Sequence, residues 1–228
     1  MAVKESRDFL IQVRRTSDVS AVAGEWRTRI DGESIQIAFD SGESHLIVGP
    51  DRIRVPVYEP PLSAIKALIV DFRGANPKAQ ELVIKTDDVT RQYDREMSFD
   101  FSENGKWLAS GDPFSLWKLD REKPENVLSS GDGYPVFSPD SRWLAATDHN
   151  GIQLFKLDSS GVDARGLVGS YGSVYFSRDG TTLMTLENGE IRRHSLSVQD
   201  LKKKAAVYLG RNLTSEDWRN EFPSEAYH

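Results

Sequence analysis

One short phrase recurs along this chain with small changes. It is IAFDSGESHLIVG from Ile37, FDFSENGKWLASG from Phe99, PVFSPDSRWLAAT from Pro135 and VYFSRDGTTLMTL from Val174. Each copy has an apolar stretch, a tight polar turn and a second apolar stretch, a pattern typical of a β-hairpin. Related units that follow one another in a single chain predict a stack of β-units instead of one unique fold.

The units align on an aromatic residue that ends the first strand of each. These residues are Phe39, Phe72, Phe101, Phe137 and Phe176. The predicted first strands cover residues 34–39, 67–72, 97–101, 134–137 and 173–176. Each is followed by a turn rich in Gly, Asp, Asn and Ser, residues that favour tight turns.

Three further strands complete each predicted unit. Second strands are expected at residues 107–110 and 143–147, and fourth strands at residues 126–129 and 166–169. Third strands are expected in the segments RIRVPVYE, VTRQYDRE, FSLWKLDRE, IQLFKLDSS and IRRHSLS. Four short antiparallel strands make one propeller blade. The predicted fold class is therefore all-β, a β-propeller of about five four-stranded blades with a short C-terminal helical tail.

The predicted domain boundaries are residues 1–200 for the propeller and 201–228 for the helical tail packed on it. In the tail, Thr214 and Asp217 have the spacing of a capping box, and Trp218, Phe222 and Tyr227 would pack against the propeller. The lysine run at residues 202–204 would begin a short helix and form a solvated face.

The N-terminal strands allow two ways of closing the propeller ring. The segments FLIQVRRTSD and VAGEWRTRI are expected to be the third and fourth strands of a blade. Either they complete the last blade and close one ring, or the array is partial and needs another polypeptide. We favour self-closure, because rings of roughly 4 to 8 blades include five as a permitted size.

The phrases FSENGKWLASG and FSPDSRWLAAT, followed by SLWKLD and IQLFKLD, resemble bacterial WD40-type propeller repeats. The resemblance covers residues 35–196. The internal hydrogen-bonded tetrad of that family is not carried over, because the chain has no Trp-Asp dipeptide and no Gly-His pair before a first strand. The end of the chain, YLGRNLTSEDWRNEFPSEAYH, resembles the tail of WD40-containing signalling NTPases and caspase-like proteins. This resemblance implies a sensor array linked to such an effector.

Composition narrows the classes of partner. A formal net charge of −6 with mixed signs disfavours nucleic acid, which selects a concentrated basic face. No apolar run approaches the roughly 20 residues of a membrane-spanning helix, and the charged opening segment does not fit a signal peptide. With no cysteine, disulfides and thiolate sites are absent. We expect a cytoplasmic protein with no cofactor and no membrane contact.

Motifs for catalysis are not found in the sequence. There is no phosphate-cradling loop, no HExxH helix and no GxSxG elbow. The histidines His45, His149, His194 and His228 have no metal-ligand spacing. Asp87 and Asp88 could be taken for a glycosidase carboxylate pair, but neighbouring turn residues point different ways. Asp140 and Asp179 are expected in hairpin turns.

Function is therefore expected to reside in the loops at one face of the propeller. The predicted partner-binding residues are Asp87, Asp88, Asp112, Asp132, Tyr134, Asp148, His149, Asn150 and Tyr171. This acidic face favours a protein or peptide partner that is basic, with the tyrosines as anchors. The expected function is a non-enzymatic interaction or sensor module. The alternative is a small propeller enzyme with two inward carboxylates about 5 to 9.5 Å apart. Trp143 is expected in a blade core.

Overall fold

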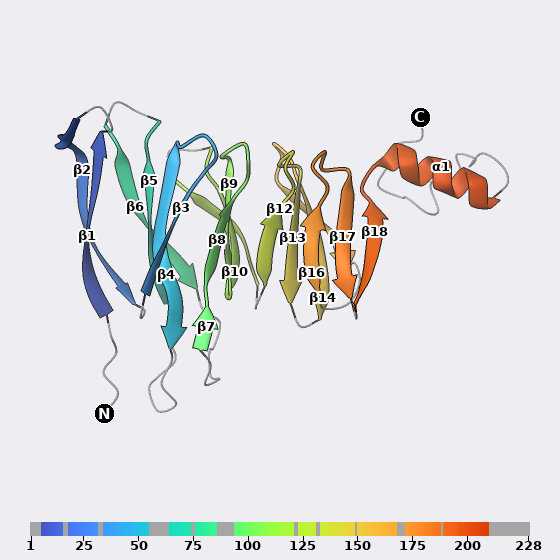
Figure 1. The fold of residues 1–228 in the computed structure, drawn as a ribbon, viewed down its shortest axis with the longest axis horizontal. Helices are drawn as coiled ribbons and strands as arrows, with labels where there is room; N and C mark the ends of the chain where they lie inside the picture. Colours follow the sequence, from blue (N-terminus) through green and yellow to red (C-terminus); the bar gives the residue numbers. More distant parts are fainter. Residues whose placement is uncertain are drawn as a thin grey trace.

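Five antiparallel sheets follow one another along the chain (Figure 1). The computed structural model describes residues 6–15, 18–31, 34–54, 64–73, 76–85, 94–120, 123–130, 133–148, 150–167, 172–187 and 189–209. The expected all-β propeller class with a short helical end is confirmed. None of the helices within these stretches is long and apolar enough to cross a membrane.

The first two sheets hold the N-terminal strands. The first pairs β1 (Ser6–Arg15) with β2 (Asp18–Asp31). The second has the order β3 (Ser34–Phe39), β4 (His45–Arg54), β5 (Ala64–Asp71) and β6 (Lys78–Lys85). A short strand, β7 (Asp94–Glu96), also pairs with β4.

The other three sheets follow the predicted repeats. The third contains β8 (Ser98–Phe101), β9 (Trp107–Gly111), β10 (Phe114–Lys118) and β11 (Glu125–Ser130). The fourth contains β12 (Tyr134–Phe137), β13 (Trp143–Asp148), β14 (Gly151–Leu157) and β15 (Val162–Leu167). The last contains β16 (Ser173–Phe176), β17 (Thr182–Glu187) and β18 (Glu190–Ser195), and α1 (Val198–Leu209) follows.

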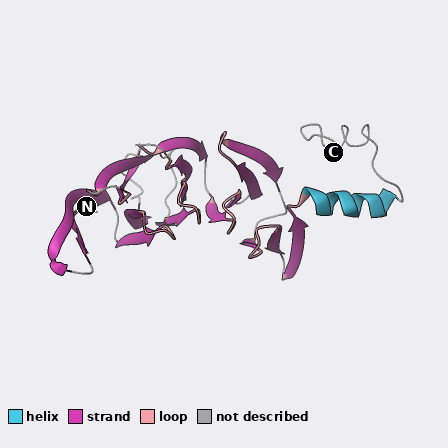
Figure 2. Cartoon of the chain, turned by 90° about the horizontal axis from the view of Figure 1, so that it is seen from above, coloured by secondary structure: helices cyan, strands magenta, loops and turns pink. Residues whose placement is uncertain are grey.

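The sheets stand side by side in an open arc (Figure 2). The first strands β3, β8, β12 and β16 face the viewer in Figure 1, on the inner side of that arc. Neighbouring first strands also contact one another, β3 with β8, β8 with β12 and β12 with β16. The sheets therefore converge on the inner side, as propeller blades do around an axis.

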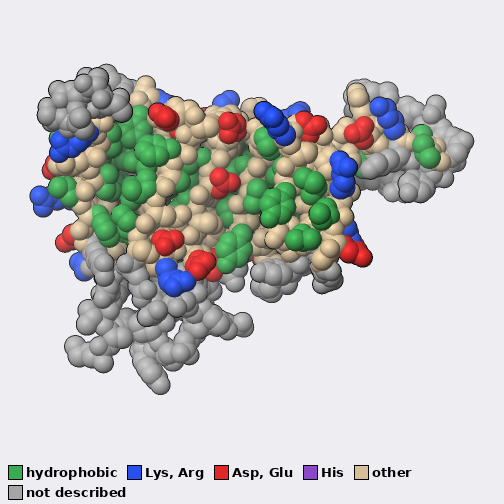
Figure 3. All heavy atoms as spheres, in the orientation of Figure 1, with side chains coloured by type: hydrophobic (Ala, Val, Ile, Leu, Met, Phe, Trp, Pro, Cys, Tyr) green, Lys and Arg blue, Asp and Glu red, His purple; other side chains and the backbone are tan. Residues whose placement is uncertain are grey.

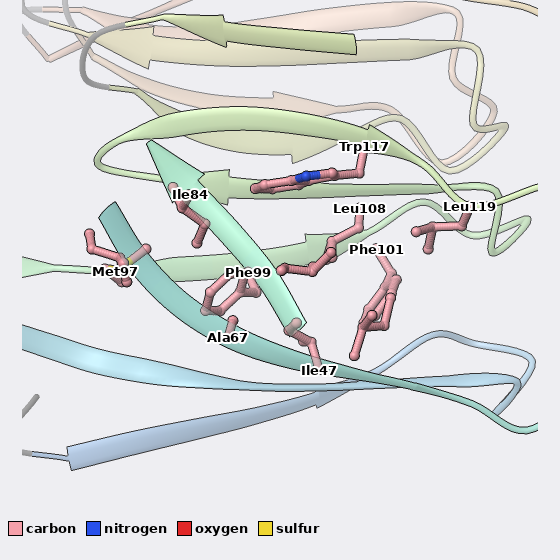
Figure 4. Close-up of a cluster of buried hydrophobic side chains, with 12 residues drawn as sticks. Ile47, Ala67, Ile84, Met97, Phe99, Phe101, Leu108, Trp117 and Leu119 are labelled. Carbon is pink, nitrogen blue, oxygen red and sulfur yellow. The ribbon is translucent and has the colours of Figure 1, made fainter. Parts of the chain in front are cut away.

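Apolar clusters fill the spaces between successive sheets. The largest lies between the second and third sheets and includes Ile47, Phe99 and Trp117 (Figure 4). Because side chains alternate across a strand, each central sheet serves two clusters. In β13, Leu144 belongs to the cluster shared with the third sheet, whereas the adjacent Ala145 belongs to the one shared with the last sheet.

A serine fixes the turn between the first and second strands of each later sheet. Ser102 Oγ accepts a hydrogen bond from the Trp107 amide (3.0 Å) and donates one to Asn104 Oδ1 (2.9 Å). The same bonds recur in Ser138, Asp140 and Trp143, and in Ser177, Asp179 and Thr182. The prediction that Asp140 and Asp179 belong to hairpin turns is confirmed.

These turns also contact each other from sheet to sheet. The backbone amide of Asn104 donates a hydrogen bond to Ser141 Oγ (3.0 Å), and this bond joins the turns of the third and fourth sheets. Gly180 has a φ of 69°, and a Cβ built on it would lie 2.5 Å from Asp140 Cγ. Neighbouring turns thus fit together closely, and Gly180 satisfies both the backbone conformation and the lack of space.

One predicted unit is wrong. Residues 67–72 were expected to be a first strand, but β5 is the third strand of the sheet that begins with β3. The segment RIRVPVYE was expected to be a third strand, yet Arg52 to Arg54 extend β4. A hairpin shows the same apolar–turn–apolar pattern whether it joins first and second or third and fourth strands. Three sheets therefore have four strands in their main path.

The N-terminal strands do not complete the last blade. β1 and β2 pair with each other from Ser6↔Asp31 onward, and their apolar face packs on β4 and β5. Within the described chain β18 pairs only with β17, so self-closure of the ring is not observed. The hairpin packs on the second sheet instead, because apolar residues of β4 such as Leu46 and Val48 are buried against hairpin residues such as Ile30.

The helix begins earlier than predicted. α1 starts at Val198, where Ser197 Oγ accepts a hydrogen bond from the Asp200 amide (3.3 Å) as an N-cap. The lysines at 202–204 therefore lie inside the helix instead of beginning it. The predicted capping box and the aromatic residues after it lie outside the described residues.

Candidate interaction surface

Four predicted partner-binding residues lie at one end of the strands, in a turn or at the terminal residue of a strand. They are Asp112, Tyr134, Asp148 and Asn150, and we call them the rim cluster. The Asp112 amide donates to the Gly133 carbonyl (3.3 Å), which joins the β9–β10 turn to the start of β12. The predicted residues Asp87, Asp88, Asp132, His149 and Tyr171 lie outside the described residues.

Asp148 and Asp112, the two carboxylates of the rim cluster, have different local structures. Asp148 Oδ1 accepts the amides of Asn150 (2.7 Å) and Gly151 (3.0 Å), so Asp148 closes its own turn. Asp112 has a φ of 40°, a left-handed conformation that Asp adopts more readily than most residues. Both residues are partly buried, and they lie at the same end of the strands as Tyr134, which is exposed.

A groove opens next to Tyr134 on the inner side of the arc. It has a volume of about 530 Å³ and lies between β12 and β16. Its walls are formed by Tyr134, Val136, Thr147, Gly172, Ser173, Val174, Tyr175 and Leu186. Figure 3 shows hydrophobic side chains gathered on this face over β12, β16 and β17. We call this feature the β12/β16 groove.

Sequence reasoning named Tyr134 but missed Tyr175, the other exposed ring of the groove. Tyr175 follows Val174, which is buried between the last two sheets, so strand alternation turns Tyr175 to the opposite face. That face of β16 has no further sheet on it in the described chain, and Tyr175 is 59% exposed. The alternation in Val174–Phe176 predicts that Tyr175 faces away from Val174. It does not tell whether a further sheet covers Tyr175, and that decides its exposure.

Among the four described first strands, β8 alone carries a carboxylate. Asp100 accepts a hydrogen bond from the Phe137 amide (3.3 Å), which links β8 to β12 across two sheets. Burial raises the pKa of Asp100, and hydrogen bonds from the Phe137 and Phe101 amides only partly oppose this. Glycosidase chemistry on this face would need a second carboxylate from residues outside these four strands.

We expect Asp100→Asn to weaken the pH dependence of stability. Because the folded state raises the pKa of Asp100, it binds the proton more tightly than the unfolded chain does. The free energy of unfolding should therefore fall as pH rises from the unfolded-state pKa, about 3.9, through the raised folded-state pKa. Asn keeps an oxygen for the Phe137 amide and does not titrate, so the variant should be the more stable protein at neutral pH.

Urea denaturation of both proteins across that window measures the effect. Glu103→Gln, which removes one negative charge from an exposed turn, is the control for the change in net charge. Parallel profiles for wild type and Asp100→Asn would contradict the assignment.

A Ser–His–Asp cluster lies at the turn between β3 and β4 and consists of Asp40, Ser44 and His45. Asp40 Oδ2 is 3.0 Å from His45 Nδ1, and Ser44 Oγ is 3.2 Å from the same nitrogen. Burial tends to raise the pKa of Asp40, but hydrogen bonds from Ser44 and His45 outweigh it and lower that pKa. Both contacts use Nδ1, so no base–nucleophile relay passes through the ring. His45 is 3% exposed, and the cavity beside it holds only about 10 Å³, the space of one water.

The described residues contain no group of three or more His, Cys, Asp or Glu arranged to hold a metal ion. His45 lies in the buried cluster above, and His194 Nε2 is 3.2 Å from Thr185 Oγ1 in the last sheet. His149 and His228 lie outside the described residues.

Comparison with known proteins supports the fold. No protein-family model matches the sequence, and no curated protein is found to be similar to it. Among solved structures, two crystal structures of Sqt1 from Chaetomium thermophilum superpose with TM-scores of 0.52 and 0.51, at 17% identity. They match 82% of this chain and 50% of the Sqt1 chain. Another similar structure is the β-propeller domain of Cps50 (Swd1) from Myceliophteria thermophila, at 10% identity and a TM-score of 0.30. That match covers 72% of this chain and 65% of the domain.

The successive antiparallel sheets of this chain have the arrangement of propeller blades. The chain spans about half the length of the Sqt1 structures that it matches. At 17% identity the likeness to Sqt1 concerns the fold alone.

Proposed function

We propose that this chain is a non-enzymatic protein-interaction module that binds an extended, basic peptide segment of a partner protein in the β12/β16 groove. The observation that carries the proposal is the groove itself, where exposed Tyr134 and Tyr175 stand over a hollow of about 530 Å³. Tyrosine side chains bury a large area at low entropic cost and are enriched among residues that dominate binding energy.

The rim cluster supports a basic partner. Asp112 and Asp148 lie at the same end of the strands as Tyr134, and none of the described residues that line the groove is a lysine or arginine. Opposite charge across an interface guides encounter and fixes orientation. A peptide with an apolar or aromatic residue for the groove and a nearby Lys or Arg for the rim therefore fits this surface.

We expect Tyr134→Ala to weaken peptide binding about 30-fold or more, the effect of losing a binding hot spot. The probe is a displayed library of short peptides that contain Lys and Arg, selected on the full chain. Fluorescence anisotropy of a selected peptide then gives the dissociation constant. Val83→Ala, which truncates a half-exposed side chain on β6, is the matched control and should bind like the wild type.

Two results would overturn the proposal. One is failure of the folded chain to select any peptide. The other is a selected peptide whose affinity is indifferent to Tyr134. Affinity should also fall as salt is added, because the rim carboxylates are partly solvated.

The partner we propose belongs to a signalling or defence effector, an NTPase or a caspase-like protease, in the cytoplasm. The link to such an effector rests on the resemblance of the C-terminal segment from Tyr208. Co-purification from the native host tests it. Recovery of an effector that is lost with Tyr134→Ala supports it, and recovery of the wild type without such a protein speaks against it.

A further inference from the structure

The outward face of the last sheet repeats a pattern that is buried elsewhere in the chain. Ile152, the second residue of β14, pairs with Thr147 and is fully buried between the fourth and last sheets. Ile191, the second residue of β18, pairs with Leu186 in the same way but is 71% exposed. The last sheet therefore presents an apolar face of the kind that receives another sheet within this protein.

Strand register defines this face as two rows. One row is Tyr175, Met184 and Arg193, and the other is Ser173, Leu186 and Ile191. Tyr175 is 59% exposed and Leu186 is 41% exposed, whereas Val174 and Leu183 on the opposite side are buried. We call these six residues the terminal face. α1 leaves the end of β18 and extends beyond the arc (Figure 2).

The other end of the arc does not offer a matching surface. The outward positions of the β1–β2 hairpin carry Asp8, Leu10, Gln12, Arg14, Val22, Glu25, Arg27 and Arg29. These side chains are exposed and mostly charged. Packing the terminal face of one copy on the hairpin of another would bury charges against apolar groups, which is costly. Head-to-tail assembly is therefore disfavoured.

We propose that the terminal face of one copy packs on the terminal face of a second copy, about a two-fold axis parallel to β17. Such an axis exchanges β16 and β18 across the interface. Each Tyr175 then lies opposite Arg193 of the second copy, and Met184 lies on Met184. Arginine stacks favourably on aromatic rings, so the single cation of the face meets an aromatic ring instead of a second cation. Isologous two-fold contacts are the commonest form of self-association.

This dimer goes beyond the peptide-binding role, but Ser173, Tyr175 and Leu186 belong to both surfaces, so a peptide in the β12/β16 groove and a second copy of the chain compete for them. Ile191 does not line the β12/β16 groove, and Tyr134 does not belong to the terminal face. Loss of the dimer in an Ile191 variant with peptide binding retained, or the reverse in Tyr134→Ala, shows which of the two surfaces acts.

Sedimentation equilibrium of the full chain over the micromolar range is the experiment. The wild type is expected to be a concentration-dependent dimer, and Ile191→Glu a folded monomer. Ile37→Glu is the matched control, because Ile37 is also an exposed isoleucine, at 59%, but on β3. It should dimerise like the wild type. Circular dichroism confirms that each variant is folded.

Arg193→Ala provides a milder variant if Ile191→Glu does not fold. Its dimer should dissociate about tenfold more easily, since the Arg193–Tyr175 contact occurs twice. A wild type that is monomeric throughout, including one whose terminal face is covered by another protein or by its own chain, overturns the proposal. A dimer unaffected by both Ile191→Glu and Arg193→Ala overturns it equally.

Discussion

Trp107→Ala is expected to lower the free energy of unfolding by about 3–5 kcal/mol. Trp107 is 3% exposed and lies in the cluster between the third and fourth sheets, with Leu116 and Phe137. The Lys118 ammonium stands 5.7 Å from the centre of its ring. Removal of the indole would leave a cavity between two rigid sheets and would also remove this cation–π contact.

Trp143→Ala is the control that the repeat itself supplies. Trp143 occupies the same position in the next unit, after the equivalent turn, but it is only partly buried beside the last sheet. Its replacement should cost clearly less than that of Trp107, so the expectation that Trp143 lies in a blade core holds only in part. Chemical denaturation of both variants measures the difference, and equal losses would mean that the sheets are packed otherwise than described.

Gly49→Ala is expected to cost about 1–3 kcal/mol, although only a methyl group is added. Gly49 lies on β4, and a Cβ built there would be 2.3 Å from Phe99 Cε2 and 2.7 Å from Phe99 Cζ. Phe99 is buried between the second and third sheets and cannot move outward without opening that cluster. The added methyl therefore forces either the ring or the strand to shift.

Gly42→Ala is the matched comparison. Gly42 lies in the exposed β3–β4 turn, and the nearest atom to a Cβ there is Ser44 Oγ, at 3.9 Å. This variant should unfold like the wild type. If Gly49→Ala were equally harmless, Phe99 would not occupy the place described here.

The repeated phrase was sufficient to predict much of the fold. The strands Ser34–Phe39, Tyr134–Phe137 and Ser173–Phe176 match their predicted bounds, because each ends at a turn whose polar residues are defined by short-range hydrogen bonds. Such turns are local, so a single sequence contains all the information that sets them.

Long-range pairing could not be derived in the same way. The unit assigned at Phe72 has the correct strand but the wrong place in its sheet, since β5 pairs with β4. The prediction that the N-terminal strands close the ring was wrong for a related reason. Which sheet a hairpin covers depends on which apolar face is left open, and no single segment contains that information.

The surface residues also divide into those that local sequence predicts and those that depend on the arrangement of the sheets. Tyr134 was predicted because it enters a first strand at a turn, and the structure places it at the same end of the strands as Asp112 and Asp148. Tyr175 and Leu186 were missed because their exposure follows from the position of their sheet in the array. Five predicted residues lie outside the described residues, and their role as partner-binding residues stays a prediction.

The contact between Asn104 and Ser141 joins one turn only to the next along the arc. Such a scaffold is extendable by gene duplication: a new unit needs to suit the two units beside it and nothing farther away. Arrays of different length can thus arise within one lineage without redesign of their interior. The variable part is then whatever stands at the two ends, where natural selection can attach different partners to the same interior.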